Sequence, residues 1–324
     1  MVSVFDKRVA FKPFEYPEIL KYQDAINHSY WLVSEWNFIS DIQDFNQLSV
    51  VEKECIKRAM LAISQIEVSV KEFWSKLGDR FPKAEFKQVG ITFGESEVRH
   101  SNAYSRLLEI LGLNDEFTTL LENPIIQGRV DYLTKYLKGA SDNSNEAFTL
   151  TLSLFSLFIE NVSLFSQFLI IKSFNKYTSL LKDIDNVVQA TQQEENIHAL
   201  FGIEIIGIIK KEFPEWFNEE FYTKLYRACK KAYESEEKIV NWIFENGELP
   251  FLSKESVKEF IKHRFNVSVQ SIGGEKVFEV NEQILDHLNW FEEELVGHIS
   301  TDFFHKKPTT YTKFNKSIQA EDLF

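Results

Sequence analysis

Two pairs of residues in this sequence have the types and the spacing to bind metal ions: Glu97 with His100, and Glu195 with His198. Each pair falls near the middle of a segment that we predict to be helical. Residues three apart lie on the same face of an α-helix. Each of the two helices therefore offers one carboxylate and one imidazole to the same point in space.

Two further carboxylates lie in apolar surroundings. Glu67 lies in the segment AMLAISQIEVSV, and Glu160 is the single charged residue of segment 147–171. A buried carboxylate without a partner is too costly to stay ionised, so each needs a cation or a proton. Taken singly, each glutamate could be an ordinary helix residue or a protonated core acid, and each histidine a hydrogen-bonded core residue.

Taken together, the four carboxylates and two imidazoles predict a site for two divalent metal ions. Four negative charges balance two ions of charge +2 inside a dry core. Carboxylate oxygens with one imidazole per ion suit iron or manganese better than metals that prefer sulfur ligands. A Glu from each of two helices, with Glu-x-x-His from each of two others, is the ligand set of ferritin-like dinuclear carboxylate proteins.

The composition favours long helices as the elements that position these residues. Only 12 Gly and 7 Pro occur among 324 residues, which leaves few turns, and 44% of residues are hydrophobic. We predict an all-α, ferritin-like helical bundle with a four-helix core and additional flanking helices. The core helices are expected at 49–77, 83–111, 144–173 and 181–212, the flanking helices at 124–139, 218–245, 254–266 and 281–296, and one short β excursion at 268–280.

Charge and cysteine content narrow the class of protein further. A net charge of −13 disfavours nucleic acid or an anionic membrane as a partner. The two cysteines, Cys55 and Cys229, are too few to build a disulfide framework or a cysteine-rich metal site. The first residues contain no apolar signal core, so we expect a cytoplasmic protein. Segment 147–171 is long enough to cross a bilayer, but Glu160 at its midpoint favours a core helix.

The segment GESEVRHSNAYSRLLE resembles the Glu-x-x-His-x-x-x-Tyr signature of the radical-generating β subunit of class I ribonucleotide reductase. The order and spacing of the six candidate residues resemble that family too. The resemblance implies that these six residues are the metal ligands, that the protein is an oxidoreductase subunit, and that Tyr104 occupies the position of the family's radical tyrosine.

The resemblance also implies a catalytic α subunit as the partner, a homodimer, and a path for radical transfer. Trp31 resembles the tryptophan at the inner end of that path, with Trp36 as a weaker candidate, and Glu194 falls where the family usually has an Asp linking this tryptophan to a ligand histidine. Tyr311 resembles the outer tyrosine of the path. We therefore expect a metal-binding domain at 1–305 and a C-terminal tail at 306–324, ending in IQAEDLF, that docks the α subunit.

The sequence departs from the family's usual pattern at its first ligand, which is Glu67 in place of Asp. A Glu there resembles subclasses in which the metal pair itself keeps the oxidising equivalent. We therefore expect two manganese ions in preference to two iron ions or a mixed Mn/Fe pair, and Tyr104 need not carry the radical. Lys71, one turn beyond Glu67, could hydrogen-bond a metal-bound carboxylate, or could be a solvated surface lysine. The alternative functions are a stand-alone ferritin-like oxidase and a non-catalytic metal storage protein.

Overall fold

The computed structural model describes residues 3–139 and 144–295, with side chains at 69–71 and 135–139 left out. Four long helical segments form the core, as expected: α3 (Val50–Ser75), α5 (Ala84–Ile110), α10 (Lys182–Glu212), and a fourth segment that begins with α8 (Asn145–Leu154) and ends with α9 (Phe165–Thr178). The all-α prediction is confirmed, since the described residues contain no strand and only one isolated bridge, between Leu249 and Leu252.

The helix α3 begins where the sequence predicts, because Ser49 forms a reciprocal cap. The Ser49 hydroxyl accepts a hydrogen bond from the backbone N–H of Glu52, and the Glu52 carboxylate accepts one from the backbone N–H of Ser49. This capping box satisfies two backbone donors that the first helical turn leaves free. It fixes the register of the helix that carries Glu67.

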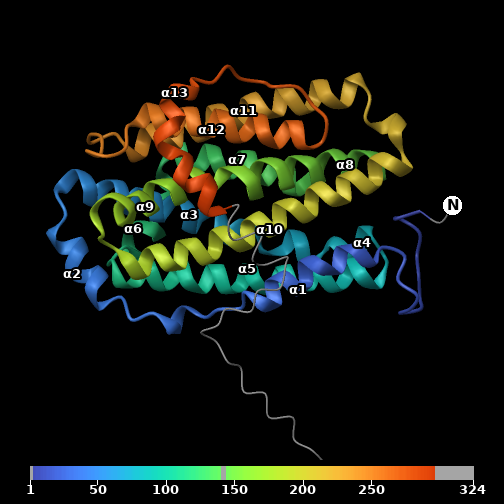
Figure 1. The fold of residues 1–324 in the computed structure, drawn as a ribbon, viewed down its shortest axis with the longest axis horizontal. Helices are drawn as coiled ribbons and strands as arrows, with labels where there is room; N and C mark the ends of the chain where they lie inside the picture. The colour runs from blue at the N-terminus through green and yellow to red at the C-terminus, as the bar shows by residue number, and fades with distance from the viewer. Residues whose placement is uncertain (1–2, 140–143, 296–324) are drawn as a thin grey trace, which may run out of the picture.

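Shorter helices surround the core (Figure 1). Helix α1 (Leu20–His28) lies along α5, while α11 (Glu219–Ile243) and α12 (Lys254–Ser271) pack together on the opposite side of the bundle. The remaining elements are α2 (Ile39–Gln47), α4 (Leu77–Arg80), α6 (Asn114–Thr118), α7 (Pro124–Gly139) and α13 (Glu282–Leu285), with 3₁₀ turns η1 (Pro17–Ile19), η2 (Val33–Glu35), η3 (Leu120–Glu122), η5 (Pro214–Trp216) and η6 (Asp286–Leu288).

The fourth core segment is not one continuous α-helix, which corrects the prediction for 144–173. Between α8 and α9 the chain forms a nine-residue π-helix, η4 (Phe155–Ser163). Asn145–Thr178 is the only helix within 3–139 and 144–295 that is long and apolar enough to cross a membrane, and 94% of its most apolar window is buried inside the protein. That burial is what a core helix requires.

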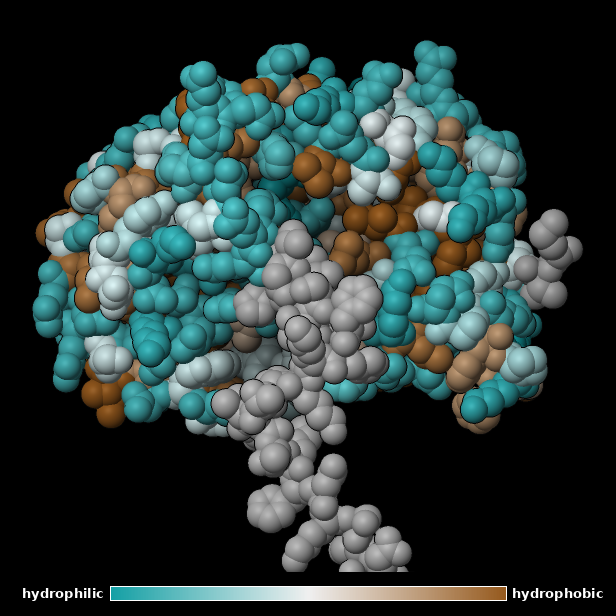
Figure 2. Space-filling model, viewed as in Figure 1, coloured by the Kyte–Doolittle hydropathy of each residue, from teal (hydrophilic) through white to brown (hydrophobic). Residues whose placement is uncertain are grey.

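The β excursion predicted at 268–280 is wrong. Helix α12 continues to Ser271, and the following residues lie over Asn266, whose side-chain Oδ1 accepts hydrogen bonds from the backbone N–H groups of Val277 and Phe278. A side-chain amide therefore satisfies the donors that a strand would have paired. The visible face of the protein is mostly hydrophilic, in keeping with its net charge of −13 (Figure 2).

Candidate metal centre

The structure brings all six predicted ligand side chains together in the core, each at most 1% exposed. Their donor atoms form two groups, each within 4.8 Å. One group contains Glu97, Glu160, Glu195 and His198, and the other contains Glu67, His100 and Glu195. Because Glu195 belongs to both groups, its two oxygens are placed to serve two neighbouring ions.

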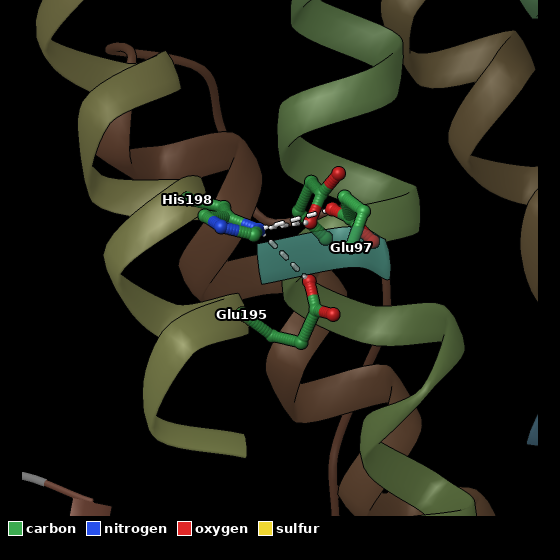
Figure 3. A group of neighbouring side chains, drawn as sticks. Glu97, Glu195 and His198 are labelled. Carbon is green, nitrogen blue, oxygen red and sulfur yellow. Dashed lines mark hydrogen bonds and ion pairs between the residues drawn. The ribbon is translucent and has the colours of Figure 1, made fainter. Parts of the chain in front are cut away.

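The donor atoms face one another closely. In the first group, His198 Nδ1 lies 3.2 Å from Glu97 Oε1, 3.4 Å from Glu160 Oε2 and 3.3 Å from Glu195 Oε2. Figure 3 shows Glu195 and His198, both from α10, pointing toward Glu97 of α5. In the second group, His100 Nδ1 lies 2.9 Å from Glu195 Oε1. Both histidines thus present Nδ1 to the carboxylates.

These donors fit a pair of cations because many of them lack any other partner. Both oxygens of Glu67, both oxygens of Glu97 and Nδ1 of His100 are buried without a hydrogen bond. Native proteins rarely leave buried polar atoms unpaired, and an ion is one of the few groups that can satisfy so many acceptors at once. The residues present therefore suit a dinuclear metal site of carboxylate oxygen and imidazole nitrogen.

The pKa shifts of the clustered side chains agree with a metal site. Burial, followed by the charges of neighbouring groups that include Glu195, raises the pKa of Glu67 and Glu160 well above the ordinary value. Burial by itself lowers the pKa of His198, but hydrogen bonds to Glu160 and the other carboxylates outweigh it, so that this pKa is raised well above its ordinary value. Without metal ions, protons must compensate the crowded carboxylates.

The π-helix η4 sets the position of Glu160 and was not predicted. Hydrogen bonds to the fifth residue back widen the helix, and π-bulges occur often at functional sites. The Ser163 hydroxyl donates to Phe158 O, five residues back, over 3.0 Å. The sequence carries one weak signal of the π-helix, namely the hydroxyl residues Thr149 and Ser153 just before it. In the structure each hydroxyl donates to the carbonyl four residues back, and bonds of this kind bend helices.

Each histidine is held from behind through its second ring nitrogen. His100 Nε2 lies 2.7 Å from Glu194 Oε2, and His198 Nε2 lies 3.0 Å from Ser96 Oγ. Such contacts orient ligand histidines in metal sites. The sequence predicted the position of Glu194 beside His100 but missed Ser96, whose only signal is that it directly precedes Glu97.

Arg99 is a second residue that sequence reasoning missed. Its Nη1 donates to both carboxylate oxygens of Glu194, over 3.0 and 3.1 Å, and its Nε donates to Glu95 Oε2 over 2.9 Å. Its guanidinium carbon also lies 5.6 Å from the centre of the Trp31 ring. Arg99 therefore supplies the positive charge that balances buried Glu194.

Trp31 lies beside the metal centre, with its ring stacked on that of His100 at a centroid distance of 6.1 Å. The expected bridge through Glu194 is present only on the histidine side, because Trp31 Nε1 has no hydrogen-bond partner in the described part of the chain. Arg99 occupies both oxygens of that carboxylate instead. Trp36 lies next in line, 5.6 Å from the Trp31 ring.

Of the three remaining predicted site residues, only Tyr104 has a side chain within the part of the chain that the structure describes. Tyr104 is 1% exposed on α5, and burial followed by the charge of Glu67 raises the pKa of its phenol well above the ordinary value. Tyr311 and the tail 306–324 lie outside the described residues, and the side chain of Lys71 does too.

Trp74 is a third residue near the candidate metal centre that sequence reasoning missed. Its Nε1 donates to Glu160 Oε1 over 2.9 Å, and its ring centre lies 6.0 Å from that of His198. It lies seven residues, close to two turns, beyond Glu67 on α3, and so on the same face of that helix. This seven-residue spacing from Glu67 was the one feature of the sequence that could have indicated that Trp74 faces the ligands.

A four-helix core with two Glu-x-x-His helices and two further glutamates defines the class of ferritin-like dinuclear-metal carboxylate proteins. Comparison with known proteins makes the assignment more specific. Residues 8–284 match the family described as "Ribonucleotide reductase, small chain", and the chain belongs to that family. It is thereby the small, or β, subunit of an oxidoreductase that pairs with a large subunit.

Individual relatives agree over nearly the whole chain. Protein 048L of Invertebrate iridescent virus 3, by name a ribonucleoside-diphosphate reductase small subunit, is 26% identical over 96% of this chain and 86% of its own length. The ribonucleotide reductase R2 subunit from Clostridium botulinum has a TM-score of 0.76 at 16% identity, over 87% of this chain and 89% of its own. Dimanganese(II)-NrdF from Streptococcus sanguinis has a TM-score of 0.74 at 17% identity, over 88% and 100%. The family assignment does not favour the oxidase and storage alternatives.

Proposed function

We propose that this chain binds two manganese ions through Glu67, Glu97, His100, Glu160, Glu195 and His198, as the β subunit of a class I ribonucleoside-diphosphate reductase. When bound, the metal pair supplies the redox chemistry that produces one oxidising equivalent for ribonucleotide reduction in the α subunit. The observation that carries this proposal is the shared carboxylate, Glu195, between two groups of buried donors.

Manganese is preferred over iron for two reasons. The first ligand, Glu67, is one methylene longer than the Asp usual in the family, which resembles the subclasses that keep the oxidising equivalent on the metals. The structural relative from Streptococcus sanguinis is by name a dimanganese(II) protein. Two iron ions or a mixed Mn/Fe pair are the competing contents of the same six-residue site.

The residues around the site have distinct tasks in this proposal. Glu194 orients His100 and keeps its Nδ1 directed at the metal site, while Ser96 does the same for His198. Trp31, stacked on His100, is the residue at the inner end of the radical path, next to the metal site. Tyr104 then serves as a buried aromatic residue near the ions, and its oxidation is not required.

We also propose a homodimer and a cytoplasmic location. Helix α5 exposes Ile91 to 64% and Val98 to 48%, seven residues apart and hence on one face. These two exposed apolar side chains favour a partner surface along α5, and a second copy of the chain would provide one. Both cysteines are free and buried, which suits a reducing compartment. Sedimentation tests the dimer: a monomer at micromolar concentration would contradict it.

The tail is proposed to dock the α subunit, with Tyr311 as the outer residue of the radical path. Deleting residues 311–324 should abolish deoxyribonucleotide formation with the α subunit and leave metal loading intact. Unchanged turnover would contradict the assignment of the tail.

The central experiment combines metal analysis with reconstitution. The protein is loaded with Mn(II), activated, and examined by electron paramagnetic resonance before mixing with the α subunit and a ribonucleoside diphosphate. We expect two manganese ions per chain, a coupled dimanganese signal without a tyrosyl signal, and metal-dependent product. Activity restored by iron alone, with a tyrosyl signal, would overturn the manganese assignment.

A further inference from the structure

A single buried guanidinium links the two helical segments that supply the carboxylate-only ligands. Arg129, on α7, is fully buried. Its Nη1 donates to the backbone carbonyl of Ala62 on α3 over 3.1 Å, and its Nη2 donates to the backbone carbonyl of Ser163 on η4 over 2.6 Å. Ala62 precedes Glu67 by five residues, and Ser163 follows Glu160 by three.

The contact at Ser163 replaces a hydrogen bond that the π-helix breaks. In a continuous α-helix, the N–H of Gln167 would donate to the carbonyl of Ser163, four residues back. Here the Gln167 N–H donates instead to Leu164 O, over 3.1 Å. The carbonyl of Ser163 at the end of η4 is therefore available to the guanidinium, and a buried carbonyl needs such a donor.

Glu236 of α11 fixes the guanidinium in this position. Its carboxylate accepts from Arg129 Nε over 3.2 Å and from Nη2 over 3.1 Å, and both side chains are fully buried. Gln167 adds a further acceptor, Oε1, at 3.3 Å from Nη2. The planar fork of Arg is rigid, so these contacts define its orientation as well as its charge.

The bridge matters because the two carboxylate helices have different principal neighbours. Helix α3 packs mainly on α5, and η4 packs mainly on α10, so each is placed chiefly by a Glu-x-x-His helix. The Arg129 side chain contacts both of them directly. A second buried guanidinium, Arg264 of α12, also donates to η4, at Asn161 O over 2.8 Å, but its described hydrogen bonds do not reach α3.

We propose that Arg129 is a positioning residue for the metal centre, which sets the distance between the helices that present Glu67 and Glu160. This inference rests on the proposed six-residue ligand set. Without the bridge, the bundle still forms, but the carboxylates of the two helices no longer converge at the spacing that two ions require.

The test uses the full chain with Arg129→Met and Glu236→Met together. Removing both charges avoids leaving an unpaired buried ion, and an apolar pair of similar volume is generally tolerated. The readouts are helix content and melting temperature of the metal-free protein, Mn(II) stoichiometry and affinity from titration, and the coupled dimanganese signal. We expect native helix content, at least a roughly 10-fold loss of Mn(II) affinity at one position, and loss of the coupled signal.

Two further variants make the result specific. Arg129→Lys keeps the charge opposite Glu236 but lacks the fork that spans two carbonyls, so we expect it to fold and to lose Mn(II) affinity as well. Arg58→Met is the matched control, because Arg58 on α3 also donates to a backbone carbonyl of another helix, at Trp242 on α11, away from η4. We expect this control to change the melting temperature and to keep wild-type Mn(II) binding.

The outcomes separate this inference from the proposed function. Wild-type Mn(II) affinity and coupling in a folded Arg129 variant would overturn the positioning role while leaving the metal site intact. An equal loss of Mn(II) affinity in the Arg58 control would also overturn the positioning role, because weakening any contact between helices would then be enough to lower the affinity. If the wild-type chain itself fails to bind two Mn(II) ions, the proposed function fails first.

Discussion

The indole nitrogen of Trp74 donates a hydrogen bond to Glu160 Oε1 over 2.9 Å, deep in the core, and so fixes one oxygen of a proposed metal ligand. The other oxygen, Oε2, faces His198 Nδ1 at 3.4 Å. The two oxygens of Glu160 thus have separate tasks, because one is anchored to the protein and the other points into the donor group.

Replacing Trp74 with Phe should release Glu160 while keeping an aromatic ring in the core. Leaving a buried acceptor without its donor costs about 1–3 kcal/mol, so the free energy of unfolding should fall by about that amount. Mn(II) affinity should fall too, as measured by titration. Trp36→Phe, beside Trp31, is the control, and an identical loss of affinity in both variants would contradict an anchoring role for Trp74.

Replacing Arg99 with Gln should destabilise the protein strongly, because Glu194 would lose its positive partner while remaining buried. Breaking a buried ion pair in this way costs about 3–5 kcal/mol, and loosening the support of a ligand histidine typically costs about 10–100-fold in metal affinity. Chemical denaturation and Mn(II) titration measure the two effects.

The matched control is Arg106→Gln on the same helix, whose side chain is 49% exposed and pairs with Glu109. An exposed pair contributes about 0–1 kcal/mol, so this variant should behave as wild type. Similar losses of stability and of Mn(II) affinity in the two variants would contradict a specific role for Arg99 in supporting Glu194 and His100.

The two cysteines should be unreactive in the folded protein. Burial raises the pKa of the Cys55 and Cys229 thiols from an ordinary value of 9.0 to about 12. At pH 8 the thiolate fraction should then be roughly 1000-fold smaller than in the unfolded chain, and thiolate is the reactive form. A thiol reagent should label two cysteines in denaturant and none in the native protein over the same time.

The same shift gives the direction of the pH effect on stability. Below about pH 9 both thiols are protonated in the folded and the unfolded states, and their contribution is fully present. As pH rises from about 9 toward 12, only the unfolded chain ionises, so the free energy of unfolding should fall. Rapid labelling of the native protein at pH 8 would contradict the burial of these thiols.

Tyr104→Phe should retain activity if the oxidising equivalent stays on the metal ions. The substitution removes one hydroxyl from a buried ring and leaves the six ligands unchanged, so metal loading should also persist. Turnover with the α subunit and the paramagnetic signal after activation are the measurements. Loss of turnover with normal metal loading would instead assign the radical to Tyr104.

Most of the six candidate metal ligands could be predicted from helical periodicity. Glu97 and His100, like Glu195 and His198, share a face because three residues nearly complete one turn, and this spacing can be read from sequence. Glu67 and Glu160 could be found because an isolated charge inside an apolar helix needs compensation. The capping box at Ser49 is a local pattern too, and the structure confirms it.

The features that were missed depend on contacts between distant segments. The π-helix around Glu160 involves hydrogen bonds to the fifth residue back, for which ordinary helical spacing gives no sign. Arg99 meets Glu194 across 95 residues, and Trp74 meets Glu160 across 86. The β prediction failed for a similar reason, because Asn266 satisfies the backbone donors of residues that otherwise favour strands.

The position of Glu195 in both donor groups has a consequence for how the protein takes up its ions. One carboxylate cannot adjust to its first ion without also moving the oxygen it offers to the second. Uptake at the two positions is therefore thermodynamically linked, so that binding of the first ion should change the affinity of the protein for the second. A substitution of Glu195 should for the same reason alter both positions together, whereas a substitution of His100 or His198 acts first on one of them.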